Sequence, residues 1–195
     1  FKDYSIRPLI FIVTGIIDTD SSFWFQVVNE DEKKYLKRID NKKRIIYIKK
    51  KYDNIETKER KALSDKEIME MKDYVDFASH TVTHPCLTRC TTKELVFELQ
   101  ESKKQIYERF RINAFSLAYP NGDYSDEVLE KMFESGYSLG LTLVPGYNHF
   151  KTNPLLIKRF SISDDVPNTE LILKSTGIWW ILKKHVKNTI SNCSY

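Results

Sequence analysis

Long apolar runs are missing from this sequence. The longest, such as residues 9–13, are far too short to span a bilayer, so no membrane span is expected. The three cysteines, an odd number, give no complete disulfide framework. There is no internal repeat and no low-complexity segment. The chain begins at Phe1, without a basic stretch leading into an apolar core, so we expect that a leader has been removed or that the chain is a fragment.

The composition that remains is that of a globular domain. The chain has 195 residues, of which 41% are hydrophobic and 30% charged, which suits one domain with a sizeable core. The net charge is +4, and lysines concentrate in residues 33–61. A nucleic-acid patch is one interpretation of this segment. Acidic residues are mixed in and no nucleic-acid-binding motif is recognisable, so we favour a solvated surface insertion at 26–62 and expect no nucleic-acid partner.

Strand and helix patterns alternate along the chain. Strands are expected at residues 9–13, 75–78, 113–119, 137–143 and 155–162, with a strand-like island at 45–48. Helices are expected at 64–74, 91–110, 125–136 and 169–187, the first two opened by capping boxes. The short connections favour an α/β fold of parallel strands with crossover helices, which places a site at the carboxyl ends of the strands.

Two of the four histidines, His80 and His84, lie four residues apart in the stretch Ser-His-Thr-Val-Thr-His-Pro, residues 79–85. Pro85 disfavours helix at His84, so the pair is expected on a loop at a strand end. Neutral imidazole suits zinc, and a hydrolytic zinc site needs a third ligand, usually a carboxylate. The alternative is that one or both histidines are ordinary hydrogen-bonded residues.

A structural zinc module is a second alternative. Cys86 and Cys90 follow the histidines closely and would complete a Cys₂His₂ set. Against this, only Pro85 separates His84 from Cys86, which makes a tetrahedral arrangement awkward.

The histidine stretch resembles the second motif of the polysaccharide deacetylase family (NodB-type, carbohydrate esterase family 4). Residues 115–124, Phe-Ser-Leu-Ala-Tyr-Pro-Asn-Gly-Asp-Tyr, resemble the third motif. Weaker similarity is found at 9–14, 134–137, 145–146 and 158–160, so the resemblance covers roughly residues 6–165. It implies a distorted, TIM-like (β/α) barrel over residues 1–165, incomplete at its N-terminus. Residues 166–195 are then an amphipathic helix and tail.

The resemblance implies a hydrolase acting on carbon–nitrogen bonds, which removes acetyl groups from an N-acetylated polysaccharide. By position, His80 and His84 match the two metal-binding histidines, and the metal is usually zinc. Asn121 stands where a backbone N–H stabilises the oxyanion. Tyr119 and Pro120 would shape the groove beside it.

Five aromatic residues are candidates for the wall of a sugar groove: Trp24, Phe25, Tyr119, Tyr124 and Tyr147. They also support a further alternative, a non-catalytic glycan-binding protein on the same scaffold. Family members commonly act at the cell envelope, although no leader is visible in this sequence.

The sequence also departs from the family pattern. The first motif, Thr-Phe-Asp-Asp-Gly, which supplies the general base and a metal-ligand Asp, is absent and is expected upstream of Phe1. Ala118 stands where many members carry an arginine. The late Leu-x-His motif is not recognisable; His149 is the nearby candidate acid, although an exposed loop histidine is the favoured interpretation. We therefore expect weak metal binding, slow or no turnover, and an exposed sheet edge that favours self-association.

Overall fold

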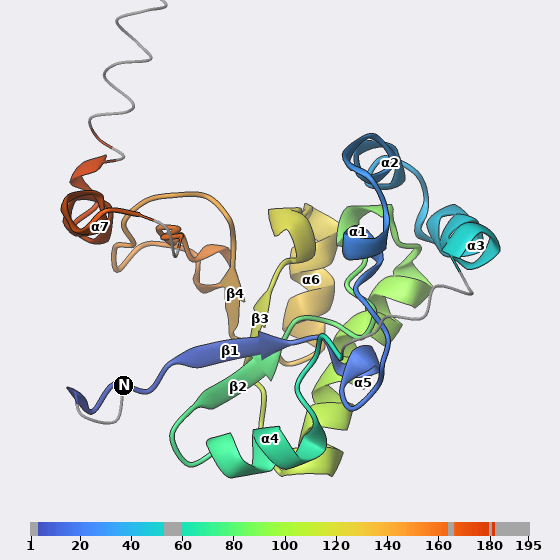
Figure 1. Ribbon diagram of the computed structural model, residues 1–195, viewed down its shortest axis with the longest axis horizontal. Helices are drawn as coiled ribbons and strands as arrows, with labels where there is room; N and C mark the ends of the chain where they lie inside the picture. Colours follow the sequence, from blue (N-terminus) through green and yellow to red (C-terminus); the bar gives the residue numbers. More distant parts are fainter. Residues whose placement is uncertain (1–3, 53–59, 164–165, 180, 182–195) are drawn as a thin grey trace, which may run out of the picture.

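The computed structural model describes residues 4–52, 60–163, 166–179 and 181. Its centre is a parallel sheet in the order β1-β2-β3-β4, formed by Leu9–Ile12, Asp76–Ser79, Ser116–Ala118 and Leu139–Leu141. Ile12 pairs with Ser79, Ser79 with Leu117, and Ala118 with Leu141. The expected α/β architecture with parallel strands is confirmed. Within the described residues the sheet is open, and β1 lies at its edge (Figure 1).

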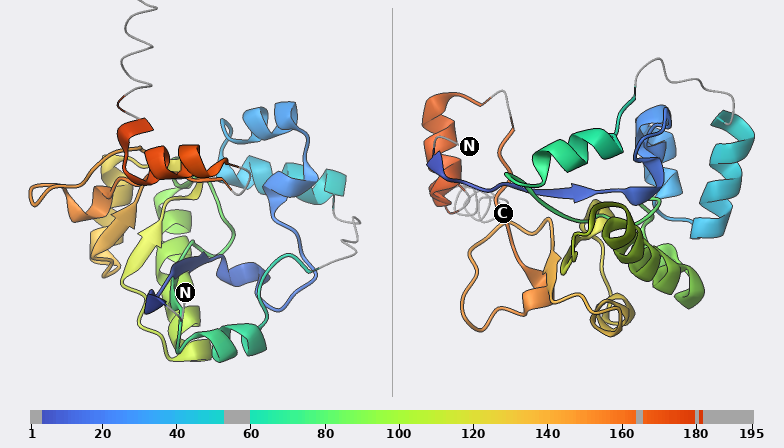
Figure 2. Two further views of the ribbon diagram at one scale, coloured as in Figure 1. Left: turned by 60° about the vertical axis from the view of Figure 1, so that its left-hand side comes forward. Right: turned by 90° about the horizontal axis from the view of Figure 1, so that it is seen from below.

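Helices cover this sheet and connect its strands. They are α4 (Asp65–Met71), α5 (Thr92–Phe110) and α6 (Asp126–Glu134), with α1 (Trp24–Val27), α2 (Glu30–Leu36), α3 (Asn41–Tyr52) and α7 (Asn168–Ser175) further out. Figures 1 and 2 show α1, α2 and α3 gathered beyond the carboxyl end of β1, on the opposite side of the molecule from α7. No helix in the described part of the chain is long and apolar enough to cross a membrane.

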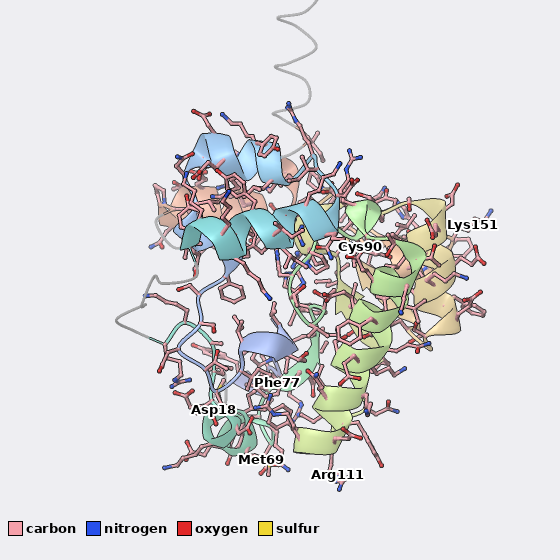
Figure 3. The ribbon with its side chains drawn as sticks, turned by 90° about the vertical axis from the view of Figure 1, so that its right-hand side faces the viewer. Asp18, Met69, Phe77, Cys90, Arg111 and Lys151 are labelled. Carbon is pink, nitrogen blue, oxygen red and sulfur yellow. The ribbon has the colours of Figure 1, made fainter. Side chains whose placement is uncertain are left out.

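Local sequence signals explain where the main helices begin. Ser64 and Thr91 each accept a hydrogen bond from the backbone three residues on, and Glu67 and Glu94 complete the two predicted capping boxes. The apolar face of α5 then packs in two core clusters. Ile106 and Phe110 join Phe77 of β2, while Leu95 and Leu99 join Leu117 and Tyr119 beside α6. Figure 3 shows α5 running from near Cys90 at one end to Arg111 at the other.

The predicted strand-like island at 45–48 is wrong, because these residues lie within α3. Their apolar side chains do not alternate across a sheet. Instead, Tyr47 and Ile48 pack against a third cluster built on Trp24, Val28 and Leu36. The lysines and arginine around them are good helix formers, so the helical period decides the structure.

The predicted last strand, 155–162, is also largely wrong. Pro154–Leu156 form a 3-10 turn, and only Ile157 makes a parallel bridge, to Leu141. Proline has no N–H to offer a ladder, and the Leu155 carbonyl accepts instead from the Tyr119 hydroxyl at 2.7 Å. The predicted tail helix is present as α7 up to Ser175, and residues 180 and 182–187 of its expected range lie outside the described residues.

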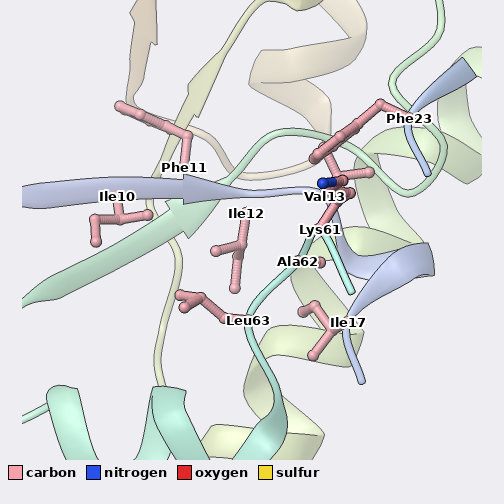
Figure 4. A pocket seen from close by; sticks show the side chains of 9 residues that line it. All are labelled: Ile10, Phe11, Ile12, Val13, Ile17, Phe23, Lys61, Ala62 and Leu63. Carbon is pink, nitrogen blue, oxygen red and sulfur yellow. The ribbon is translucent and has the colours of Figure 1, made fainter. Parts of the chain in front are cut away.

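A small cavity lies along the β1 edge. Its walls include Ile10, Phe11 and Ile12 of the strand, with Phe23 and Leu63 from the segments on either side of α1–α3 (Figure 4). The lining is apolar apart from Lys61 and the backbone, and Ile12, Val13 and Ile17 within it are buried. Self-association through this edge stays a prediction.

Gly140 of β4 controls how closely the last part of the chain approaches Tyr119. A Cβ at this position would overlap the Leu155 carbonyl oxygen and the Tyr119 hydroxyl. We expect Gly140→Ala to force them apart and to lower the free energy of unfolding by about 1–3 kcal/mol. Denaturant unfolding measures this change. The exposed neighbour Ser138 serves as control, since Ser138→Ala should change the value by less than about 0.5 kcal/mol; equal effects of the two changes would contradict the prediction.

Candidate metal and substrate site

The histidine pair lies where β2 ends, as predicted. The backbone N–H of His80 still donates to Ile12 in β1 at 2.8 Å, and the chain then leaves the sheet. Thr81 and His84 have positive φ values of 71° and 54°, which are uncommon for residues with a side chain. These two bends turn the loop back on itself. The two imidazole rings come to 4.6 Å between centroids, at an interplanar angle of 81°.

Glu98 of α5 holds this loop in place. Its carboxylate is buried and accepts hydrogen bonds from the backbone N–H groups of Val82 at 2.7 Å and Thr83 at 3.0 Å, and from the Thr83 hydroxyl. A buried carboxylate that accepts several hydrogen bonds is a strong anchor, because each bond is charge-assisted. The Trp24 indole N–H adds a contact from α1, to the His84 carbonyl at 2.9 Å.

The two imidazoles are in the form that binds metals. His80 Nδ1 lies 2.7 Å from the Ala118 carbonyl oxygen, which makes Nδ1 the donor and leaves Nε2 with a free lone pair. His84 Nδ1 is buried and has no hydrogen-bond partner among the described residues. Burial lowers the pKa of His80, and burial together with His80 lowers the pKa of His84 to about 3. Both rings are therefore neutral near pH 7.

The third-motif turn faces the pair from the end of β3. Asn121 has a φ of 58° inside the turn Pro120–Gly122, where the N–H groups of Gly122 and Asp123 donate to Tyr119 and Pro120. The Asn121 side chain reaches across to Cys86, with 3.4 Å between Nδ2 and Sγ. Three of the positive-φ residues with side chains, Thr81, His84 and Asn121, thus lie around one site.

These elements enclose a cavity of about 300 Å³. Four of the predicted site residues line it: His80, His84, Tyr119 and Asn121. Phe25, one of the aromatic residues considered for a sugar groove, also lines it. The sequence did not single out Leu143 or the cations that complete the lining, which are Lys33 of α2, Lys37 at its C-cap, and Arg159. The lysines were recognisable only as part of a basic segment, because nothing in the sequence shows which face of α2 turns toward the histidines.

The other predicted site residues lie around the cavity or away from it. Trp24 is buried, with the Arg44 guanidinium over its ring at 5.0 Å, so it packs beneath the loop. Pro120 is buried in the turn, and Tyr124 is partly exposed with its ring 5.5 Å from that of Tyr119. His149 is exposed and is not part of the lining, as expected for a loop histidine.

The metal fit is partial. Two neutral histidines with one ring nitrogen fixed suit zinc, yet no group of three or more His, Cys, Asp or Glu within the described residues could hold a metal. The Cys₂His₂ alternative is therefore wrong. Cys86 is a buried free thiol and Cys90 a partly buried one, and burial raises the pKa of both.

Fold and site together define an α/β protein with a parallel sheet and a histidine pair at the carboxyl ends of its strands. The family profile described as polysaccharide deacetylase matches residues 1–140. The chain belongs to the polysaccharide deacetylase family.

Individual relatives agree with this assignment. YxkH of Bacillus subtilis (strain 168), named as a polysaccharide deacetylase, is 31% identical over 85 residues, which cover 43% of this chain and 30% of YxkH. The fold resembles that of the Streptococcus pyogenes deacetylase PplD, at a TM-score of 0.61 and 21% identity, over 89% of this chain and 60% of that one. A de-N-acetylase from Aggregatibacter actinomycetemcomitans gives 0.58 at 15% identity, over 87% and 65%. The matches span less than two thirds of each of these relatives.

Glu98 offers a direct test of how the loop is held. Glu98→Ala leaves the buried Val82 N–H and the partly buried Thr83 N–H without their acceptor, so we expect a loss of about 3 kcal/mol in the free energy of unfolding. Denaturant unfolding measures it. Glu108, exposed on the same helix, is the matched control, and Glu108→Ala should leave stability within about 0.5 kcal/mol. A stable Glu98→Ala protein would show that the loop has another anchor.

Proposed function

We propose that this chain carries the histidine and oxyanion parts of a metal-dependent site that removes acetyl groups from an N-acetylated polysaccharide. The observation that supports this most directly is the arrangement of His80 and His84. The two rings are adjacent, that of His80 is held by the Ala118 carbonyl, and both share one cavity with the Asn121 turn.

In this proposal His80 and His84 hold a divalent metal, most simply zinc. When bound, such a metal polarises an acetyl carbonyl and lowers the pKa of water. The chain's own residues orient the substrate. Asn121 lines the cavity, and its backbone N–H serves the developing oxyanion in this proposal. Tyr119 and Phe25 exclude water from the cavity walls.

The same residues set a limit on the activity of the chain. A hydrolytic zinc site uses three protein ligands, and a general base must lie within hydrogen-bond reach of the attacking water. Among the described residues that line the cavity there is no carboxylate to serve as either. We therefore expect weak metal binding, and slow or no turnover, from the 195 residues alone.

Calorimetric titration with Zn²⁺ tests the metal site. We expect one weak site in the unaltered chain, lost in His80→Ala and in His84→Ala because each removes one of two ligands. The double change Cys86→Ser/Cys90→Ser should retain binding. Zinc binding that survives loss of both histidines would contradict the proposed metal site. Rapid release of acetate from chitooligosaccharides by this chain would contradict the expected slow turnover.

A second candidate function is glycan binding without catalysis. The cavity's aromatic and cationic lining without a described carboxylate favours it. Binding of an acetylated oligosaccharide that is unchanged in His80→Ala, with no acetate released in the presence of Zn²⁺, would select this candidate over the enzyme.

A further inference from the structure

The charge of the cavity beside the histidines has a single sign. Lys33, Lys37 and Arg159 all line it, and the lining includes no acidic residue within the described part of the chain. A cavity with cationic walls and partly buried surfaces concentrates anions, because charge is screened less there than in open solvent.

The two lysines lie on one side of α2, Lys33 within the helix and Lys37 at its C-cap. Lys33 and Lys37 are four residues apart, so they lie one above the other on the side of the helix that turns toward the cavity. Both are partly buried, whereas Lys34 and Arg38 are exposed and do not line the cavity. Figure 3 shows α2 beside α3 at this end of the molecule. The helix therefore separates cavity-facing cations from surface cations.

Local partners leave this positive charge largely uncompensated. Lys33 pairs with Glu30 at 2.5 Å, but the Glu30 side chain is 76% exposed, so water competes for the pair. Lys37 makes no ion pair with any residue that the structure describes. Arg159 uses its Nε to donate to the Thr142 carbonyl at 3.0 Å, which positions the guanidinium without neutralising it.

We propose that this cavity takes an anionic glycan. An acetylated sugar lies at the histidines, and a carboxylate or phosphate on a neighbouring sugar pairs with Lys33 and Lys37. The inference rests on the proposed function for the acetylated sugar and adds the charge class of the polymer. Lysine ammonium groups bind such anions as point charges, so the two lysines select for charge rather than for one anion geometry.

Oligosaccharide binding by the metal-free chain provides the test. A hyaluronan tetrasaccharide alternates N-acetylglucosamine with glucuronate, and tetra-N-acetylchitotetraose has the same length without charge. We expect the charged ligand to bind more tightly, and added NaCl to remove the difference. The double change Lys33→Ala/Lys37→Ala should weaken hyaluronan binding about tenfold, as for two partly buried charge contacts, and leave chitotetraose binding unchanged.

The matched control is Lys34→Ala/Arg38→Ala. This variant also removes two positive charges from the same part of the chain, so it reproduces any effect of net charge. It changes only side chains that do not line the cavity. Hyaluronan binding should stay within twofold of the unaltered chain, and circular dichroism should show that both double variants are folded. If the lysine pair proves necessary for folding, Lys33→Gln/Lys37→Gln, which keeps polar side chains on the helix, gives the same comparison.

Equal binding of the two tetrasaccharides would overturn the proposal, as would an equal loss in both double variants. Competition by N-acetylglucosamine 6-phosphate distinguishes the two anions. If it displaces hyaluronan and this displacement depends on Lys33 and Lys37, the lysines bind phosphate. If it does not displace hyaluronan, the lysines bind carboxylate. Since no metal or turnover is needed, failure of deacetylation leaves this result intact, and loss of the charge preference leaves the deacetylase proposal intact.

Discussion

The buried carboxylate of Glu98 is the contact on which the site depends. Two residues of the histidine loop have left-handed backbones, at a cost of roughly 1–3 kcal/mol each. A buried anion is itself unfavourable unless it is fully hydrogen-bonded. The same hydrogen bonds offset both the cost of the left-handed backbone and the cost of burying the carboxylate. This is because the bent loop directs the N–H groups of Val82 and Thr83 at the carboxylate. Glu98 belongs to the long, well-packed helix α5, which holds the loop and therefore the two imidazoles in place.

The α1–α3 region supplies both the support and the charge of the cavity. Its Trp24 holds the His84 carbonyl from below, and Arg44 lies over the indole ring. Its lysines line the cavity from the other side. A segment that looks in sequence like a solvated basic stretch thus determines the electrostatic character of the space beside His80 and His84. Substrate preference and loop stability are linked through the same helices.

The features of this protein that could be predicted from its sequence depend on short-range residue patterns. The capping boxes at Ser64 and Thr91, and the proline after His84, place two helices and the histidine loop without reference to the rest of the chain. Contacts between distant segments were not predictable. Glu98 is one of many acidic residues on a helix, and nothing local marks it as the anchor of a loop that is 15 residues away in sequence. The strand prediction for residues 45–48 was wrong for a related reason. The packing of this segment against the Trp24 cluster is a tertiary contact that the local sequence does not show.

The hydrogen bond between His80 and the Ala118 carbonyl has a consequence for how such a site evolves. Because the acceptor belongs to the main chain, the bond depends on the path of β3 and not on a hydrogen-bonding side chain at position 118. Ala118 is buried, so size and not polarity limits which residues can replace it. The tautomer and the orientation of the His80 ring are therefore set by the sheet itself.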